Sequence, residues 1–339
     1  MPPRYDQHTK GSALIREFAP SIAGKIILVT GTAPKGIGAL FCTAIAQQTN
    51  PDKAPRLIIL TGRTTASIAP TRDAIKESNP AIETMVLAMD LGSLKSVREA
   101  AALVNSDEWA REVPHIDLLV NNAGIMACPY ATTAEGFESQ FGVNHLGHFL
   151  FTNMIMGKLL KAAAPRVVAV SSTGHRVGPI RWGDVGFKDG QCYNKWTAYG
   201  QSKTANCLFA LALARKLGSK GLQAYSLCPG AYMTNLGRHL DWSETGDALE
   251  SLRTVDEIFG NPMCHEGFDH GFTDADGIIA NHVFVSFNDD IKGFNGGYFK
   301  YCHYADQAKD EVWPWANSAI EADRLWRLSE NMVGQEFPY

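Results

Sequence analysis

Two side chains suited to acid/base chemistry, Tyr199 and Lys203, stand four residues apart in this sequence. In a helix this spacing places both on one face, so the phenol and the ammonium group can act on one ligand. A cation about 5 Å from a phenol is worth about 3 kcal/mol at an effective dielectric constant near 20, or roughly two pKa units. Lys203 is therefore expected to lower the pKa of Tyr199, which could then protonate a carbonyl oxygen or deprotonate an alcohol. In a chain with ten tyrosines the spacing arises easily by chance, so its context must support the interpretation.

A glycine-rich segment, Thr30-Gly-Thr-Ala-Pro-Lys-Gly-Ile-Gly38, directly follows the first apolar run of the chain, Lys25–Thr30. Glycines let the backbone approach a pyrophosphate closely, and the helix expected next presents its positive N-terminus. The alternative is a plain tight connection between a strand and a helix. The position after the first strand favours a dinucleotide site.

Basic residues near this segment indicate which nicotinamide nucleotide binds. NAD sites usually carry Asp or Glu at the end of the second strand, whereas this chain has Thr61-Gly-Arg63 there. Arg63 and Lys35 would suit the extra phosphate of NADP. The alternative is that both are solvated surface charges. We expect NADP(H), whose oxidised nicotinamide would help Lys203 to lower the pKa of Tyr199 toward neutrality.

Short apolar runs that alternate with longer helical patterns must position these residues. Seven runs are interpreted as strands of a largely parallel sheet: 25–30, 56–60, 85–90, 116–120, 166–170, 223–227 and 297–300. This alternation predicts an α/β fold, a single Rossmann-type doubly wound sheet with helices on both faces.

The predicted domain organisation is one dinucleotide-binding domain, 25–339, preceded by an N-terminal extension, 1–24. The pattern breaks at 235–271, which we interpret as a long excursion that forms a substrate lid, with Trp242, Phe259, Met263 and Phe268 as its apolar residues. Those residues could equally form a small core of the segment. A helix is expected to resume at Thr273 with Asp276 placed as in a capping box, and 301–339 is expected to be a helical C-terminal segment.

Several motifs in order make the chain resemble the short-chain dehydrogenase/reductase family across most of residues 25–300. The matching pieces are Thr30–Gly38, Asp90–Leu91, Asn121–Gly124, Asn144, Ser171–Ser172, the Tyr199/Lys203 pair and Pro229–Thr234. The runs Asn144–Phe149 and Ser171–His175 are most similar to the branch of retinol dehydrogenases and protochlorophyllide reductases. Two features depart from the pattern: four residues rather than three separate Gly31 from Gly36, and Arg176–Lys195 is an inserted loop.

The resemblance implies a role for each matching residue. Ser172, the second residue past its strand, would bond the reacting oxygen, Asn144 would hold a water that connects Lys203 to solvent, and Lys203 would also bind the nicotinamide ribose. Asp90 would face the adenine, and Thr234 would touch the pyrophosphate or the carboxamide. The residues expected to contact the cofactor are Gly31, Lys35, Gly36, Ile37, Gly38, Arg63, Asp90, Leu91, Asn121, Ala123, Gly124, Tyr199, Lys203, Pro229, Gly230 and Thr234.

The amino-acid composition limits which binding partners and which cellular compartment are expected. A formal net charge of −4 gives no reason to expect a nucleic acid, and the seven cysteines, none spaced as Cys-x-x-Cys, favour a reducing, cytoplasmic setting without a membrane anchor. His145 and His148 lack a third ligand at a recognised spacing, so no metal is expected. Helices over 136–161 and 197–217 are long enough for a dimer face, which leaves a homodimer as an open expectation.

The leading hypothesis is an NADPH-dependent carbonyl reductase or alcohol dehydrogenase that acts on a ketone, aldehyde or secondary alcohol of a bulky apolar or aromatic molecule, with secondary metabolism as the expected context. Two alternatives stay open. One is another reaction on the same fold, either reduction of an activated C=C bond or epimerisation. The other is a dinucleotide-binding sensor or scaffold without catalysis.

Overall fold

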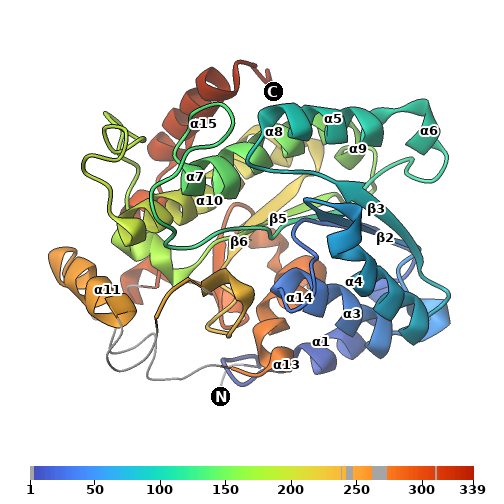
Figure 1. The fold of residues 1–339 in the computed structure, drawn as a ribbon. Helices are drawn as coiled ribbons and strands as arrows, with labels where there is room; N and C mark the ends of the chain where they lie inside the picture. The colour runs from blue at the N-terminus through green and yellow to red at the C-terminus, as the bar shows by residue number, and fades with distance from the viewer. Residues whose placement is uncertain (1–3, 238, 242–246, 262–272, 310) are drawn as a thin grey trace.

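A twisted eight-stranded sheet forms the centre of the computed structural model, which describes residues 4–237, 239–241, 247–261, 273–309 and 311–339 (Figure 1). The strand order is β3-β2-β1-β4-β5-β6-β7-β8, in which the first seven strands are parallel and β8 pairs antiparallel with β7. The strands are β1 (Ile26–Val29), β2 (Leu57–Gly62), β3 (Glu83–Ala88), β4 (Leu118–Asn121), β5 (Arg166–Val170), β6 (Gln223–Leu227), β7 (Tyr298–Lys300) and β8 (His303–Tyr304). The doubly wound sheet expected from the sequence is confirmed, with one short strand added at its edge.

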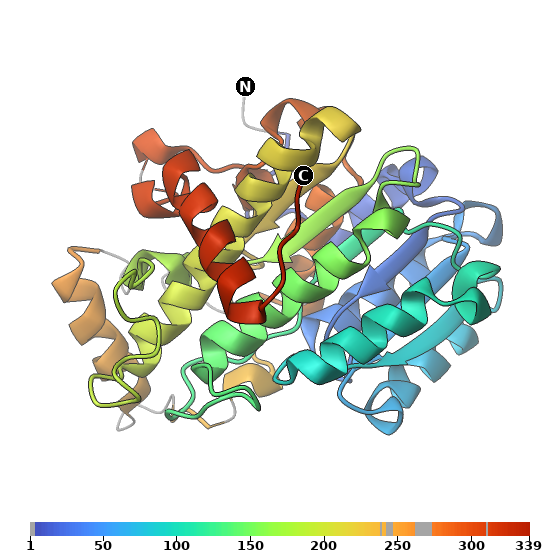
Figure 2. The ribbon, with the colours of Figure 1, turned by 90° about the horizontal axis from the view of Figure 1, so that it is seen from above.

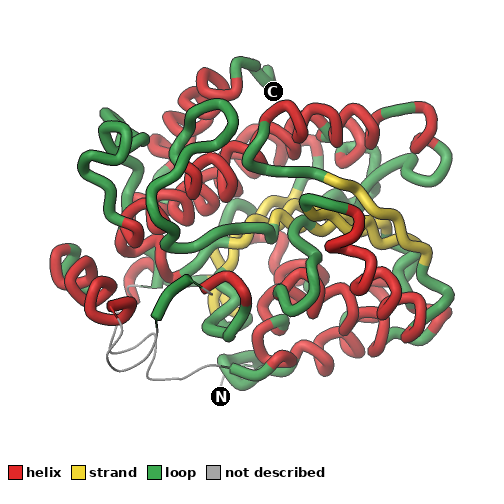
Figure 3. The backbone as a smooth tube through the Cα atoms, viewed as in Figure 1, coloured by secondary structure: helices red, strands yellow, loops and turns green. Residues whose placement is uncertain are grey.

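Two layers of helices cover the sheet, because successive residues of each buried strand point to opposite faces. On one face lie α5 (Leu94–Asn105), α8 (Gly147–Met154), α10 (Lys195–Leu217) and α15 (Ala319–Val333), which share an apolar core with Ile26 and Leu28. On the other lie α1 (Gly11–Glu17), α3 (Ile37–Gln48), α4 (Thr65–Ser78) and α14 (Ala280–Phe287), whose core includes Ile27 and Val29. Figure 3 shows the strands in yellow between the two helical layers.

The segment before residue 25 belongs to this second core. Helix α1 packs against α3 and α14, and α2 (Ala19–Ile22) follows directly. Leu14, Ile15 and Ile22 are completely or almost completely buried. The predicted N-terminal extension thus packs on the dinucleotide-binding domain over its described residues 4–24.

The expected lid, 235–271, is described only in part. Its helix α11 (Asp247–Ile258) packs against Val177 and Trp196, whereas Trp242, Met263 and Phe268 lie outside the described residues. The chain continues with α13 (Ala275–Ile278), whose N-cap is Asp274 and not the expected capping arrangement with Asp276. The remaining short helices are α6 (Asp107–Ala110), α7 (Ser139–Phe141) and α9 (Met156–Leu159).

Helix α15 covers α10 and α8 within the same chain. Its Trp326 packs against Phe149 of α8 and Phe209 of α10, with ring centroids 5.0 and 6.2 Å away. Figure 2 shows α15, in red, lying across α10. The helices that were expected to offer a dimer face are thus largely buried by their own chain. None of the helices in the described part of the chain combines the length and hydropathy needed to span a bilayer.

Candidate active site

A cavity of about 410 Å³ opens at the carboxyl ends of the parallel strands. Its walls come from the segments that follow β1, β4, β5 and β6, together with α10 and α11. The strand order reverses between β1 and β4, and a crevice at such a switch point is where doubly wound sheets bind their ligands. Among the residues that line the cavity are Ile37, Met126, Ser172, Val177, Trp196, Tyr199, Pro229, Gly230, Tyr232, Thr234, Leu252 and Tyr301.

The glycine-rich loop lies directly on the segment after β4. Gly31 has a φ of 74°, and a Cβ added there would lie 2.7 Å from the Cα of Ala123. A Cβ on Gly38 would lie 2.5 Å from the amide nitrogen of Asn122, so neither position accepts a side chain. The extra loop residue is absorbed by a turn, in which Gly36 N–H bonds Ala33 O at 3.2 Å and Lys35 takes a φ of 66°. Gly36 then begins α3 as its N-cap.

Asn122, which the sequence analysis leaves out, holds this loop in place. Its Nδ2 donates to Thr30 O at 2.8 Å and lies 3.3 Å from Gly31 O. Asn121, by contrast, is 2% exposed and donates to Thr152 Oγ1 of α8 at 2.9 Å. The Asn121 side chain thus points into the helix layer, so only the backbone of this residue could line the cofactor cleft, and its contact with the cofactor stays a prediction.

Lys35 and Arg63 are exposed at neighbouring strand ends. Thr32 N–H and Thr32 Oγ1 both donate to Thr61 O, at 2.9 and 3.1 Å, which ties the glycine-rich loop to the end of β2. Neither Lys35 nor Arg63 forms an ion pair with any carboxylate of the described residues. Asp90, after β3, is also exposed, and its Oδ1 accepts from Gly92 N–H. Leu91 is buried beneath Gly147.

The first turns of α10 bring Tyr199 to the cavity and Lys203 to a position close behind it. The helix begins at Asn194, whose side chain accepts from the amides of Trp196 and Thr197. Tyr199 and Lys203 are 6% and 4% exposed, and Lys203 Nζ lies 5.5 Å from the centre of the phenol ring. Lys203 Nζ also donates to Val170 O at 3.0 Å.

Burial controls the protonation of both side chains. It raises the pKa of the Tyr199 phenol above its usual value, opposed only in part by a hydrogen bond from Ser172. Burial also lowers the pKa of Lys203 to about 8, because the ammonium group loses hydration. The lowered pKa that the sequence analysis expects for Tyr199, from Lys203 together with an oxidised nicotinamide, is not found in the protein alone, in which desolvation dominates. Tyr199 is a protonated donor at neutral pH.

The two serines after β5 point in different directions. Ser171 Oγ is buried and donates to Lys203 O at 2.7 Å. Ser172 lines the cavity, caps the short 3-10 helix Thr173–Val177 and accepts from Gly174 N–H at 3.0 Å. The structure thus brings Ser172, and not the hydroxyl of Ser171, together with Tyr199.

Asn144 lies in a π-helical turn, Gly142–Leu146, between α7 and α8. Its Oδ1 accepts from Ile125 N–H at 2.8 Å, and its Nδ2 donates to Ile125 O and to Ser202 Oγ, both at 2.9 Å. A Cβ on Gly124 would lie 3.1 Å from Asn144 Oδ1 and 3.5 Å from Lys203 Nζ. Gly124 therefore leaves the room in which Asn144 and Lys203 approach each other. Single-turn π-bulges occur often at functional sites.

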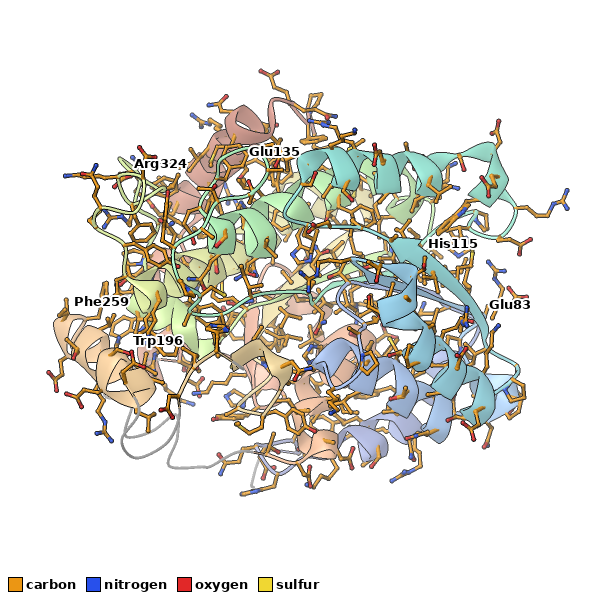
Figure 4. The ribbon with its side chains drawn as sticks, viewed as in Figure 1. Glu83, His115, Glu135, Trp196, Phe259 and Arg324 are labelled. Carbon is orange, nitrogen blue, oxygen red and sulfur yellow. The ribbon has the colours of Figure 1, made fainter. Side chains whose placement is uncertain are left out.

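Several cavity residues carry no recognisable motif. Met126 follows the Asn121–Gly124 segment, Leu252 comes from α11, and Tyr301 comes from the β7–β8 turn with a φ of 52°. Figure 4 labels Trp196, another of these residues, on α10 beside α11. Only their apolar or aromatic character could have marked them, and the chain has many such residues.

Comparison with known proteins identifies the family. Residues 25–244 match the family model described as short chain dehydrogenase. Mouse retinol dehydrogenase 14 is 38% identical over 74% of this chain and 67% of its own length, and human retinol dehydrogenase 13 is 34% identical over 94% and 87%. A solved structure of an uncharacterised protein from Mycobacterium paratuberculosis covers 94% of this chain and 96% of its own, with 30% identity and a TM-score of 0.65. The chain belongs to the short-chain dehydrogenase family of nicotinamide-dependent oxidoreductases, in its retinol-dehydrogenase-like branch.

Proposed function

We propose that the protein is an NADPH-dependent oxidoreductase that transfers hydride to or from the carbonyl or secondary alcohol of a bulky apolar or aromatic molecule. The hydrogen bond between Ser172 and Tyr199, which both line the cavity, carries this proposal, with Lys203 close to the Tyr199 ring. Family membership supplies the class of reaction, oxidoreduction of an alcohol or a carbonyl. Cofactor preference, substrate and a cytoplasmic location are the proposed parts.

The residues at the strand ends fit a nicotinamide dinucleotide. Gly31 and Gly38 leave a backbone cradle that no side chain fills, and the N-terminus of α3 points toward it. Arg63 and Lys35 lack carboxylate partners among the described residues, which supports a preference for the 2′-phosphate of NADPH. When bound, the reduced nicotinamide supplies a hydride. Thr234 lines the cavity and Lys203 lies behind Tyr199, where the nicotinamide end would be held.

The chain's own groups supply the proton. Tyr199 Oη and Ser172 Oγ are within hydrogen-bonding reach of each other, so one carbonyl oxygen can meet both. Tyr199, kept protonated by burial, donates its proton to that oxygen, while Ser172 aligns it. Lys203 stabilises the tyrosinate that remains, and the approach of Asn144 to Lys203 supports a role for both in replacing the proton.

The walls of the cavity support an uncharged, apolar substrate. None of its lining residues is Asp, Glu, Lys, Arg or His among the described part of the chain, and Ile37, Val177, Trp196 and Leu252 form apolar surface. An ionic substrate would lose its hydration there without a partner. The names of the relatives, retinol dehydrogenases, point the same way, since retinol is an apolar alcohol.

The proposal is tested by following NADPH oxidation against a panel of aromatic and aliphatic carbonyls. Tyr199→Phe should lower kcat about 10²- to 10⁴-fold, because the proton donor is lost. Tyr225→Phe is the matched control, since Tyr225 is fully buried in β6 and its hydroxyl contacts Gln223 and Ile291 outside the cavity. Equal turnover by wild type and Tyr199→Phe would remove the acid/base role.

A further inference from the structure

A buried path of hydrogen bonds runs from the nucleotide loop to the catalytic helix through His148. Thr30 Oγ1, at the end of β1, lies 2.8 Å from His148 Nε2, and His148 Nδ1 lies 3.0 Å from Asn144 O. Asn144 Nδ2 donates to Ser202 Oγ at 2.9 Å, and Ser202 Oγ donates to Tyr199 O at 2.7 Å. Four consecutive contacts therefore join the glycine-rich segment to the backbone of Tyr199.

The partners of Thr30 define which nitrogen of His148 carries the proton. Thr30 Oγ1 accepts from the amides of Asn122 and Ala123, both at 2.9 Å. Its own proton then has His148 Nε2 as its nearest acceptor, since Val120 O is 3.4 Å away. Nε2 as acceptor requires the neutral imidazole with the proton on Nδ1, and Nδ1 is the atom that faces the carbonyl of Asn144.

The surroundings of the imidazole favour this neutral form. His148 is 2% exposed, and burial lowers its pKa to about 4, with a further contribution from the charge of Lys203. The other titratable group that interacts with it is His145, which is itself buried and neutral. Within the described part of the chain, no carboxylate contributes to its pKa.

A π-turn precedes His148 and contains Asn144. Within this turn Gly147 N–H bonds Gly142 O, five residues back instead of the four of an α-helix. The imidazole of His148 satisfies the carbonyl of Asn144 from the side chain of the next turn. The same turn directs the Asn144 side chain toward Ile125 and Ser202.

We propose that His148 is a positioning residue that couples the nucleotide loop to the catalytic tyrosine, and that it acts as the neutral imidazole protonated on Nδ1. Its Nε2 accepts a hydrogen bond from Thr30, the first residue of the glycine-rich loop. Its Nδ1 side holds the carbonyl of Asn144 and, through Ser202, the first turns of α10. This inference deepens the proposed oxidoreductase function and rests on it.

Two substitutions separate the effects of the two hydrogen bonds that the imidazole of His148 forms. The amide of His148→Asn can replace the Nδ1 donor but falls short of Thr30, whereas the amide of His148→Gln reaches Thr30 and leaves Asn144 O without its donor. His148→Gln should lower kcat about tenfold with the carbonyl KM changed less than twofold, as expected for one lost buried hydrogen bond. His148→Asn should keep kcat within about threefold but weaken NADPH binding about threefold or more.

His145→Gln is the matched control. His145 is fully buried in the same π-turn, but its Nε2 lies 2.7 Å from Ser329 Oγ of α15, on the side away from the cavity. It should lower Tm as much as His148→Gln and leave kcat within about twofold. Equal losses of kcat in His148→Asn and His148→Gln, or in His145→Gln and His148→Gln, would overturn the proposal.

Measurements of NADPH affinity and of the His148 tautomer test the inference without any measurement of enzyme activity. NADPH affinity, followed by its fluorescence, should fall in His148→Asn and stay at the wild-type value in His148→Gln. Two-bond ¹⁵N–¹H spectra of histidine-labelled protein should show a neutral Nδ1-protonated ring, absent in His148→Gln and unchanged down to about pH 5.5. Equal NADPH affinities or an Nε2-protonated ring would disprove the coupling. An inactive wild type with the expected affinities and tautomer would instead remove the proposed reaction.

Discussion

Two exposed cations without carboxylate partners in the described chain, Lys35 and Arg63, stand at the ends of β1 and β2. A guanidinium group binds a phosphate through two parallel hydrogen bonds, whereas a guanidinium group that stays solvated contributes little free energy. Arg63→Ala should therefore weaken NADPH binding about tenfold or more and change NADH binding less than about twofold. Titration of each nucleotide against the protein measures both values.

Arg72→Ala provides the control for a general loss of positive charge. Arg72 lies in the middle of α4, the helix that follows β2, but pairs with Asp73 at 2.8 Å. Its loss should change neither affinity by more than about twofold, because an exposed pair of this kind contributes little. Wild-type protein that bound NADH as tightly as NADPH would contradict the assignment of Arg63 to a phosphate.

At the residue scale, sequence patterns predict which residues gather but not how each side chain points. The prediction places Asn121 in the cleft, but the alternation of a strand sends its side chain to Thr152 and leaves Asn122 to hold the loop. The prediction also assigns a lowered pKa to Tyr199 from a Coulomb argument alone. Burial reverses that direction, and the degree of burial is a property of the packed molecule that no spacing reveals.

At the scale of elements, α11 forms one wall of the cavity. Leu252 faces the cavity from this helix, while Ile258, at its end, is 75% exposed. Leu252→Trp should therefore narrow the cavity and raise KM for bulky aromatic carbonyls about tenfold, while small aliphatic carbonyls change less than about twofold. Steady-state kinetics with a size series of carbonyls checks this expectation.

Ile258→Trp, the same side chain on the same helix, should leave both KM values unchanged. If Leu252→Trp affected small and bulky carbonyls equally, α11 would not shape the substrate site. Figure 4 labels Phe259 next to the end of this helix, where it packs against Trp315 at 5.9 Å between ring centroids. That contact anchors the end of the helix to the C-terminal segment, away from Leu252.

Helices and strands could be predicted from the sequence where a single pattern dominates the segment. Buried parallel strands appear as short apolar runs, so all seven predicted strands occur within three residues of their expected bounds. Strand β8 has two residues, too few for any period. Helix α1 was missed because its few apolar residues, among them Leu14 and Ile15, stand in a polar stretch, and Asp274 and Asp276 are equivalent as capping residues until the backbone is known.

At the scale of the whole molecule, the described cores enclose four neutral histidines. Burial lowers the pKa values to between about 3 and about 4 for His145, His148, His175 and His282. In the unfolded chain the same groups titrate near 6.5, so between these values the unfolded state binds more protons. The free energy of unfolding should therefore fall as the pH drops below about 6.5, by up to about 2 kcal/mol per histidine at pH 5.

Urea denaturation at pH 7 and pH 5 measures this loss. The carboxylates whose pKa values are lowered, such as Asp274 and Glu311, contribute stability that is lost only at lower pH, so this window reports the histidines. His145→Gln should reduce the difference between the two pH values by about one histidine's share. A free energy of unfolding that is the same at pH 7 and pH 5 would show that these rings take up protons in the folded state.

The fold class was fully predictable because alternating βα units allow few arrangements, whereas the position of α15 was not. Its face toward α10 carries Ala322, Leu325 and Trp326, an ordinary amphipathic pattern that any apolar neighbour would satisfy. Only long-range packing decides that this neighbour is the helix of Tyr199 and Lys203.

The cover that α15 provides has a consequence for biosynthesis. A ribosome releases α10 more than a hundred residues before α15, so the back of the catalytic helix stays bare while the rest of the chain is translated. During that interval Phe149 and Phe209 are part of an exposed apolar surface, to which chaperones or other nascent chains can bind. The catalytic helix is thus complete well before the helix that covers it.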